Sequence, residues 1–200
     1  IGEKKMTHSL HRKGIEKDLK KDYVVLAMLA AGFNDKYDDS RQKLIKIGEI
    51  LKKHNPVNIM PEIGWRTSPT VTATFNNIKT VKKIIRILKK EDLGLSIVIS
   101  GLISEIEKVV KEVDLGVHTI HFSLGTFGRR EILPEEKILE ITTMCGHHTI
   151  SPQSITHYIN LIKQGKLTVE KAAKKLTKPC VCGIFNTSRA IQILNTLVKD

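Results

Sequence analysis

The chain has 200 residues, of which 40% are hydrophobic and 27% charged, and its formal net charge is +12. A chain of this size and composition buries a globular core without a disulfide framework. No apolar run approaches the roughly 20 residues that cross a bilayer, and the N-terminus lacks the apolar core of a signal peptide. We therefore expect a cytoplasmic protein with no membrane partner.

The positive charge suits an anionic partner, either an anionic small molecule, an acidic protein or nucleic acid. Many lysines stand in predicted helices that also carry glutamates, for example Lys82 and Lys83, and this favours a solvated face. Only five Phe, three Tyr and one Trp could stack on bases. Nucleic acid is therefore the least favoured of the three partners.

Residues 1–21 form a polar, basic N-terminal segment. His8, His11 and Arg12 make a compact group of hydrogen-bond donors within it. Two interpretations stay open. The group is either the end of a helical tail or a set of contacts to an anion or substrate just before the first strand.

Residues 22–133 are predicted to form an α/β domain, because helical and strand patterns alternate there with short connections. The predicted strands are 22–31, 57–60, 70–75, 94–100 and 117–124, and the predicted helices are 40–54, 80–90 and 102–113. Alternation of this kind predicts an open sheet with packed helices and at least partly parallel strand pairing. No Gly-x-Gly-x-x-Gly or Walker motif is present, so no nucleotide site is predicted.

Two loops of this domain carry candidate site residues. The loop 61–69 is predicted to be irregular, and its Trp65 either closes the edge of the core or lines a pocket with Arg66. A second loop runs from Gly125 to the adjacent arginines, Arg129 and Arg130. Its backbone amides and guanidinium groups favour phosphate or carboxylate, and the alternative is that the arginines simply lie on the surface beside Glu131.

The last part of the chain, residues 134–200, is predicted to be a helical module. Its predicted helices cover 135–144, 151–165 and 168–178. Ser151 followed by Pro152 is a typical helix start, and Thr168 caps the next helix. The second and third helices are therefore expected to form a hairpin.

All three cysteines lie at the ends of these helices: Cys145, Cys180 and Cys182. The hairpin would bring Cys145 close to the other two, as thiolate ligands of one inorganic centre require. The alternative is that all three are small buried hydrophobic residues. A disulfide between Cys180 and Cys182 would be strained, and an odd number of cysteines argues against a disulfide framework. None of the three lies in an apolar periodic run, so we favour a metal centre.

This C-terminal part resembles the small iron–sulfur domain of bacterioferritin-associated ferredoxin and of assimilatory nitrite reductases. In that family a Cys-x-Cys pair precedes a threonine-capped helix, and a second cysteine pair follows the next helix. The resemblance implies that Cys145 and His147 occupy the first pair. It also implies that Cys180 and Cys182 occupy the second pair, before a closing helix at 186–197. This chain departs from the family in its missing cysteine and in having one residue, not two, inside the second pair.

Three thiolates leave a [2Fe–2S] or [4Fe–4S] cluster with histidine as its fourth ligand or with an open iron. His147 is favoured over His148, because the Cys145-x-His147 spacing is that of the resembled pair. An open iron would bind an anionic substrate as a Lewis acid. Zinc held by three cysteines and one histidine is the alternative.

The whole chain is also similar to uncharacterised proteins of methanogens and strict anaerobes, through the motifs HSLHRKG, DYVVLAM, TTMCGHH and KPCVCGIFN. We therefore expect an iron–sulfur protein of anaerobic metabolism. Its cluster would transfer electrons with a redox partner protein or activate an anionic small molecule, including in cofactor maturation. The alternative is a zinc-stabilised basic module that binds nucleic acid or a partner protein without catalysis.

Overall fold

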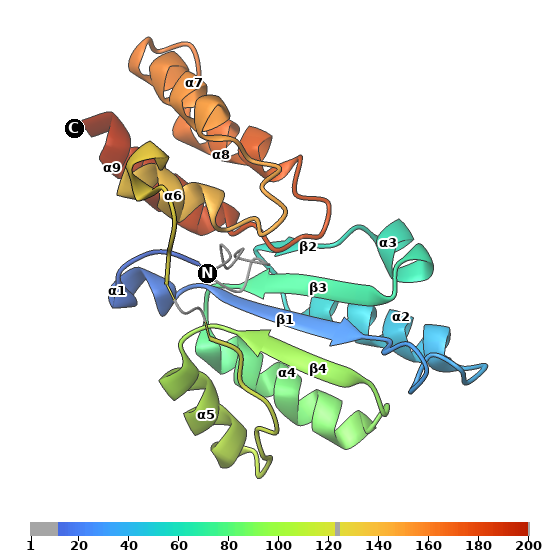
Figure 1. The fold of residues 1–200 in the computed structure, drawn as a ribbon. Helices are drawn as coiled ribbons and strands as arrows, with labels where there is room; N and C mark the ends of the chain where they lie inside the picture. The colour runs from blue at the N-terminus through green and yellow to red at the C-terminus, as the bar shows by residue number, and fades with distance from the viewer. Residues whose placement is uncertain (1–11, 123–124, 200) are drawn as a thin grey trace. The chain divides into compact units, whose positions relative to one another are not determined.

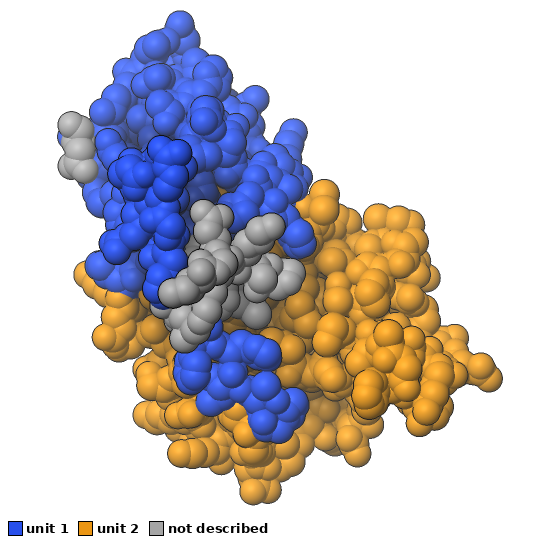
Figure 2. Space-filling model, viewed as in Figure 1, with its two compact units in different colours: residues 1–15, 118–180, 187–200 blue, residues 16–117, 181–186 orange. Residues whose placement is uncertain are grey.

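The computed structural model describes residues 12–122 and 125–199. Contacts divide the chain into two compact units, coloured separately in Figure 2. The sheet unit comprises residues 16–117 and 181–186. The helical unit comprises residues 1–15, 118–180 and 187–200. His8 and His11 lie outside the described residues. In the parts that are described, no helix combines the length and the apolar composition needed to cross a membrane.

The sheet unit contains a four-stranded sheet with the order β2-β3-β1-β4. Its strands are β1 (Tyr23–Met28), β2 (Asn58–Ile59), β3 (Thr70–Phe75) and β4 (Ser96–Ser100). The mixed α/β class is confirmed, but the predicted parallel pairing is wrong, because every pair of neighbouring strands is antiparallel. Each long helical connection joins two strands that have a third strand between them, as in a split β-α-β arrangement. The alternating helix and strand patterns in the sequence therefore predicted most of the helices and strands, but they did not predict which strands lie side by side in the sheet.

One face of the sheet carries the core. The cross-strand pairs Tyr23–Phe75, Val25–Ala73 and Ala27–Val71 all point to this face, and every one of these side chains is buried. Figure 1 shows the helices α2 (Ser40–Lys53) and α4 (Ile78–Glu91) on one side of the sheet. Their buried hydrophobic residues are Leu44, Ile47 and Leu51 from α2, and Val81, Ile84, Ile85 and Leu88 from α4. Helix α5 (Ile103–Glu112) packs on α4, and the short α1 (Glu16–Leu19) precedes β1.

The loop predicted around Trp65 is instead the short helix α3 (Glu62–Thr67). Trp65 is buried, and its Nε1 donates a hydrogen bond to the Met60 carbonyl oxygen at 2.8 Å. A Cβ atom on Gly48 of α2 would lie only 2.6 Å from the indole ring, so glycine leaves room for it. Trp65 therefore closes the edge of the core, while Arg66 is exposed.

The predicted strand 117–124 is wrong where the structure describes it. Residues 117–122 pair with no strand among the described residues, and 123–124 lie outside that set. Val117, Ile120 and Phe122 are exposed. The β-branched alternation here predicted strand geometry, but a strand also needs a hydrogen-bonding neighbour that sequence pattern does not supply.

The second face of the sheet receives the segment 181–186. The Oγ1 atoms of Thr72 and Thr74 in β3 donate to the carbonyl oxygens of Cys182 and Gly183, the latter at 3.1 Å. Asn58 of β2 donates to the Phe185 carbonyl oxygen at 3.0 Å. This short segment therefore belongs to the sheet unit, although its sequence neighbours on both sides belong to the helical unit.

The helical unit contains α6 (Glu136–Thr142), α7 (Pro152–Lys163), α8 (Val169–Thr177) and α9 (Thr187–Lys199). Both predicted helix caps are confirmed. Ser151 Oγ accepts the Ser154 amide at 3.1 Å, and Thr168 Oγ1 accepts the Lys171 amide at 3.3 Å. Gly165 ends the first hairpin helix with φ +68°, a conformation that glycine adopts without strain.

A buried ion pair joins three parts of the helical unit. Arg189 of α9 contacts Glu140 of α6 at 3.1 Å, and its side chain is 1% exposed. The same guanidinium donates to the carbonyl oxygen of Lys13. Gly14, next in the chain, has φ +146°, and a Cβ there would clash with Arg189. The pair therefore holds the N-terminal residues 12–15 against α6 and α9.

Candidate metal centre

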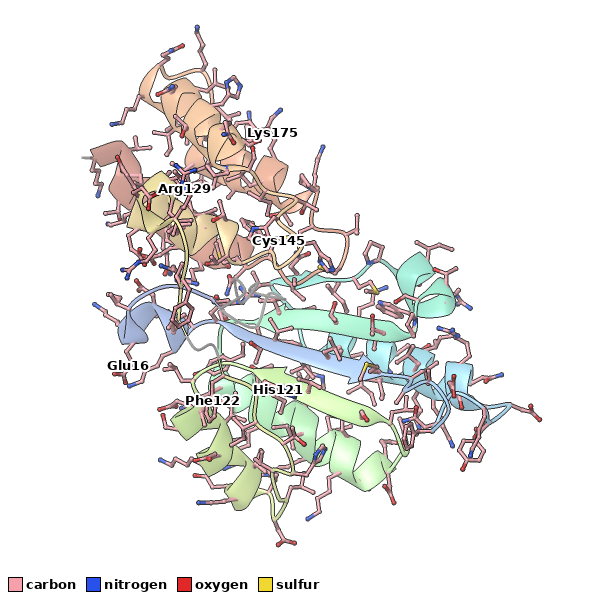
Figure 3. The ribbon with its side chains drawn as sticks, viewed as in Figure 1. Glu16, His121, Phe122, Arg129, Cys145 and Lys175 are labelled. Atoms are coloured by element: carbon pink, nitrogen blue, oxygen red, sulfur yellow. The ribbon has the colours of Figure 1, made fainter. Side chains whose placement is uncertain are left out.

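Cys145 lies in the tight turn that follows α6 and is labelled in Figure 3. Its amide donates to the Thr142 carbonyl oxygen at 3.2 Å, and its own carbonyl oxygen accepts the His148 amide at 3.1 Å. The α6 residues Ile138 and Ile141 are buried, which fixes the helix end that leads into the turn. The side chain of Cys145 is fully buried as a result.

Cys180 follows α8 and is held by a bond from its amide to the Thr177 carbonyl oxygen at 3.0 Å. It is buried, and its thiol is within hydrogen-bonding reach of the Cys145 thiol. Neither thiol is in a disulfide. The α7–α8 hairpin therefore brings together, inside the helical unit, two cysteines that are 35 positions apart in the sequence.

The environment of Cys145 disfavours a lone thiolate. The hydrogen bond with Cys180 and burial together raise the pKa of Cys145 to about 12. A hydrogen bond with Thr149, whose Oγ1 lies 3.0 Å from Cys145 Sγ, opposes this effect. The Cys145 thiol thus stays protonated at neutral pH unless a cation compensates the charge of its thiolate.

Cys182 belongs to the sheet unit. It is half-buried and packs against the core of that unit. Its carbonyl oxygen is held by Thr72 Oγ1, and the following Gly183 has φ +71°. Its backbone position is therefore set by the sheet.

His147 and His148 are both exposed in the turn after Cys145. His148 adopts φ +52°, the left-handed region that few residues other than glycine favour. Its side chain borders a cavity of about 250 Å³ within the helical unit. The cavity walls are mostly apolar and include Leu133, Pro134 and Ile150, with Lys13 and Thr143 among the polar residues. The residues that line the cavity therefore come from the chain just before Cys145, such as Thr143, and from the chain just after it, such as His148.

The four predicted metal ligands are not assembled as one set. Among residues 12–122 and 125–199, no three His, Cys, Asp or Glu side chains gather closely enough to hold a metal ion. The Cys145–Cys180 pair is observed. Cys182 and His147 stay predicted ligands.

The candidate anion contacts outside the cysteine region are arranged as follows. Gly125 has φ +102°, and Arg130 opens a short 3-10 helix, Arg130–Ile132. Arg129 is exposed and pairs with Glu131 at 3.0 Å. Of the N-terminal group His8, His11 and Arg12, only Arg12 falls within the described part of the chain, where it is half-buried.

One residue beside the thiols was missed by the sequence analysis. Thr149 contacts Cys145 Sγ through its hydroxyl group. The signal was present in the sequence, since Thr149 stands four positions after the cysteine, at the end of a short turn. A hydroxyl group in that place can orient a thiolate that binds metal.

Comparison of the chain with protein-family models, curated proteins and solved structures gave no match, so the functional argument rests on the thiol pair and its surroundings.

Proposed function

We propose that this chain is an iron–sulfur protein whose cluster is held by Cys145, Cys180, Cys182 and His147. The observation that supports the proposal is the Cys145–Cys180 pair, two buried thiols that form no disulfide and lie within hydrogen-bonding reach at opposite ends of a helical hairpin. Buried thiols that serve only as hydrophobic residues have no need to converge. Thiolates that share one metal centre must do so.

The electrostatics of the pair fit a cationic ligand. The pKa of Cys145 is raised to about 12 by the adjacent Cys180 thiol and by burial. A metal ion would stabilise both thiolates, so binding must release protons and should tighten as pH rises. The Thr149 hydroxyl, 3.0 Å from Cys145 Sγ, is placed to donate to the thiolate once it forms.

An iron–sulfur cluster bound here would supply one-electron redox chemistry or, at an iron without a protein ligand, a Lewis acid for an anionic substrate. The protein contributes a site from which solvent is largely excluded, because Cys145 and Cys180 are 0% and 5% exposed. Electron transfer to a redox partner in the cytoplasm of an anaerobe is the use that we propose. Zinc bound by the same residues, in a binding module without catalysis, is the alternative.

The test is anaerobic purification followed by analysis of iron, acid-labile sulfide and zinc, together with the visible spectrum. We expect iron and sulfide in comparable amounts, with sulfur-to-iron absorption that disappears in Cys145→Ser and in Cys180→Ser. Bound zinc without colour would assign the alternative. A protein that binds neither metal after reconstitution, or serine variants that keep the full metal content, would contradict a metal centre.

His147 and His148 provide a matched pair of variants for the fourth ligand. Both are exposed neighbours in the same turn, but His148 has φ +52°, so the stability of each alanine variant is measured beside its spectrum. We expect His147→Ala to change the visible spectrum and to remove the pH dependence of the reduction potential. His148→Ala should leave both unchanged. An effect of His148→Ala alone would reassign the ligand, and no effect of either would indicate an iron without a histidine ligand.

A further inference from the structure

Helix α8 presents a stripe of four lysines along one face. Lys171, Lys174, Lys175 and Lys178 stand at positions i, i+3, i+4 and i+7, and all four are exposed. The opposite face is buried through Ala172, Ala173 and Leu176. Figure 3 labels Lys175, which projects from α8. We call these four residues the α8 lysine stripe.

The α8 lysine stripe has no carboxylate partner within the described residues. Other lysines do: in the sheet unit Lys46 pairs with Glu91, and Lys82 with Glu112. In α4, Arg86 also acts electrostatically on Glu112, and Lys90 on Glu91. The only acidic residue of α8 is Glu170, and no ion pair is observed between it and the stripe.

This arrangement is unfavourable for the isolated helix. Like charges three and four positions apart repel one another. The dipole favours Lys174 and Lys175 in the last turn, but it disfavours Lys171 in the first turn. An unfavourable charge cluster without an internal counter-charge is typical of a surface that meets an oppositely charged partner.

The stripe ends beside Cys180. Lys178 is two residues before Cys180, and Pro179, which lies between them, is exposed. An exposed apolar residue at the end of a charged row is compatible with the polar rim of a transient protein–protein interface. The stripe contains no arginine and α8 contains no aromatic residue, which are the residues that favour phosphates and bases. From Lys171 to Lys178 the helix rises only about 10 Å, too short to follow a nucleic-acid duplex through one turn of about 34 Å.

We propose that the α8 lysine stripe docks an acidic protein. Identifying this partner as the redox partner rests on the proposed function, whereas the docking surface itself rests on α8 alone. Complementary charge would guide an acidic partner to the end of the helix where Cys180 lies.

The experiment measures binding of poly-L-glutamate, as a defined acidic polypeptide, to the full chain at several salt concentrations. The test variant carries Lys171→Gln, Lys174→Gln, Lys175→Gln and Lys178→Gln. The matched control carries Lys53→Gln, Lys79→Gln, Lys83→Gln and Lys90→Gln, which remove the same charge from exposed lysines of α2 and α4. We expect the test variant to bind at least about tenfold more weakly and the control to change by less than about threefold. Binding of the unaltered chain should weaken as salt rises.

Equal losses in the test and control variants would overturn the proposal, because the attraction would then follow net charge and no particular surface. Tighter stripe-dependent binding to a DNA duplex than to poly-L-glutamate would also overturn it and assign nucleic acid. Metal content is measured on the same samples. Loss of binding with full metal content confirms the stripe, and stripe-dependent binding by a metal-free chain keeps the docking surface while removing the proposed function.

Discussion

Tyr23, the first residue of β1, is fully buried, and its hydroxyl group has no hydrogen-bond partner among the described residues. Burial is the main cause that raises the pKa of Tyr23 to about 12, and the carboxylates of Glu105 and Asp22 add to it. An unpaired buried hydroxyl group destabilises the fold, because it loses its hydrogen bonds to water without replacement. Gly101 lies against the same ring, where a Cβ would be 2.6 Å from Tyr23 Cδ1.

Replacing Tyr23 by phenylalanine should therefore stabilise the protein by up to about 1 kcal/mol near pH 8. The gain should grow at higher pH. Between the unfolded pKa of 10.0 and the folded pKa of about 12, the unfolded chain releases the Tyr23 proton first, so the stability of the unaltered protein falls with rising pH. Urea unfolding at pH 8 and pH 11 measures both effects. Tyr37→Phe, at an exposed position, is the control and should change neither value. A loss of stability in Tyr23→Phe would show that the hydroxyl group has a partner.

At the scale of elements, the segment 181–186 is held to the sheet by a glycine. Gly183 has φ +71°, and a Cβ there would clash with the backbone of Ile59 and Met60. The close approach lets Thr74 Oγ1 reach the Gly183 carbonyl oxygen at 3.1 Å. The backbone of Cys182, the preceding residue, depends on the same contact with β3.

Gly183→Ala should destabilise the protein by several kcal/mol, because it adds a backbone clash to the strain of a left-handed residue. Gly165→Ala is the matched control: φ is +68° there, but no atom lies within 4 Å of the added Cβ. The control should lose only about 1 kcal/mol, the cost of the left-handed backbone alone. Denaturant unfolding of both variants gives the comparison. Equal losses at the two sites would mean that the segment does not pack closely on β2.

At the scale of the whole molecule, the two units depend on different interactions. The sheet unit has a continuous hydrophobic core between the sheet and α2 and α4. The helical unit buries apolar side chains of α6, α8 and α9, such as Ile141, Leu176 and Leu194, and adds the Arg189–Glu140 ion pair and the thiol pair. A metal ion bound to Cys145 and Cys180 would add its binding free energy mainly to the helical unit.

Removing the metal with a chelator should therefore loosen the helical unit more than the sheet unit. Hydrogen exchange followed by mass spectrometry should show faster exchange in α6, α7 and α8, while β1 and β3 keep their protection. Cys145→Ser should reproduce this pattern without chelator. Uniform acceleration across both units would instead indicate global destabilisation, and unchanged exchange in the helical unit would show that metal does not stabilise it.

Local sequence signals predicted most of the elements. Apolar periodicity located α2, α4 and α5, and the caps at Ser151 and Thr168 located the hairpin helices, because these signals act between residues a few positions apart. The same signals placed Cys145 and Cys180 at helix ends. Two short-range predictions were wrong: the loop around Trp65 is a helix, and residues 117–122 have no strand partner in the described structure.

The sequence by itself determined the mixed α/β class and the helical hairpin that carries Cys145 and Cys180 at its two ends. Only the tertiary structure decided which strands pair, that all of the observed pairs are antiparallel, and that residues 181–186 belong to the sheet unit. It also decided that Thr149 meets the Cys145 thiol and that Arg189 is buried against Glu140. The physical reason is range: a cap or a helical stripe depends on neighbours in the chain, whereas strand order, buried ion pairs and thiol contacts depend on side chains that only packing brings together.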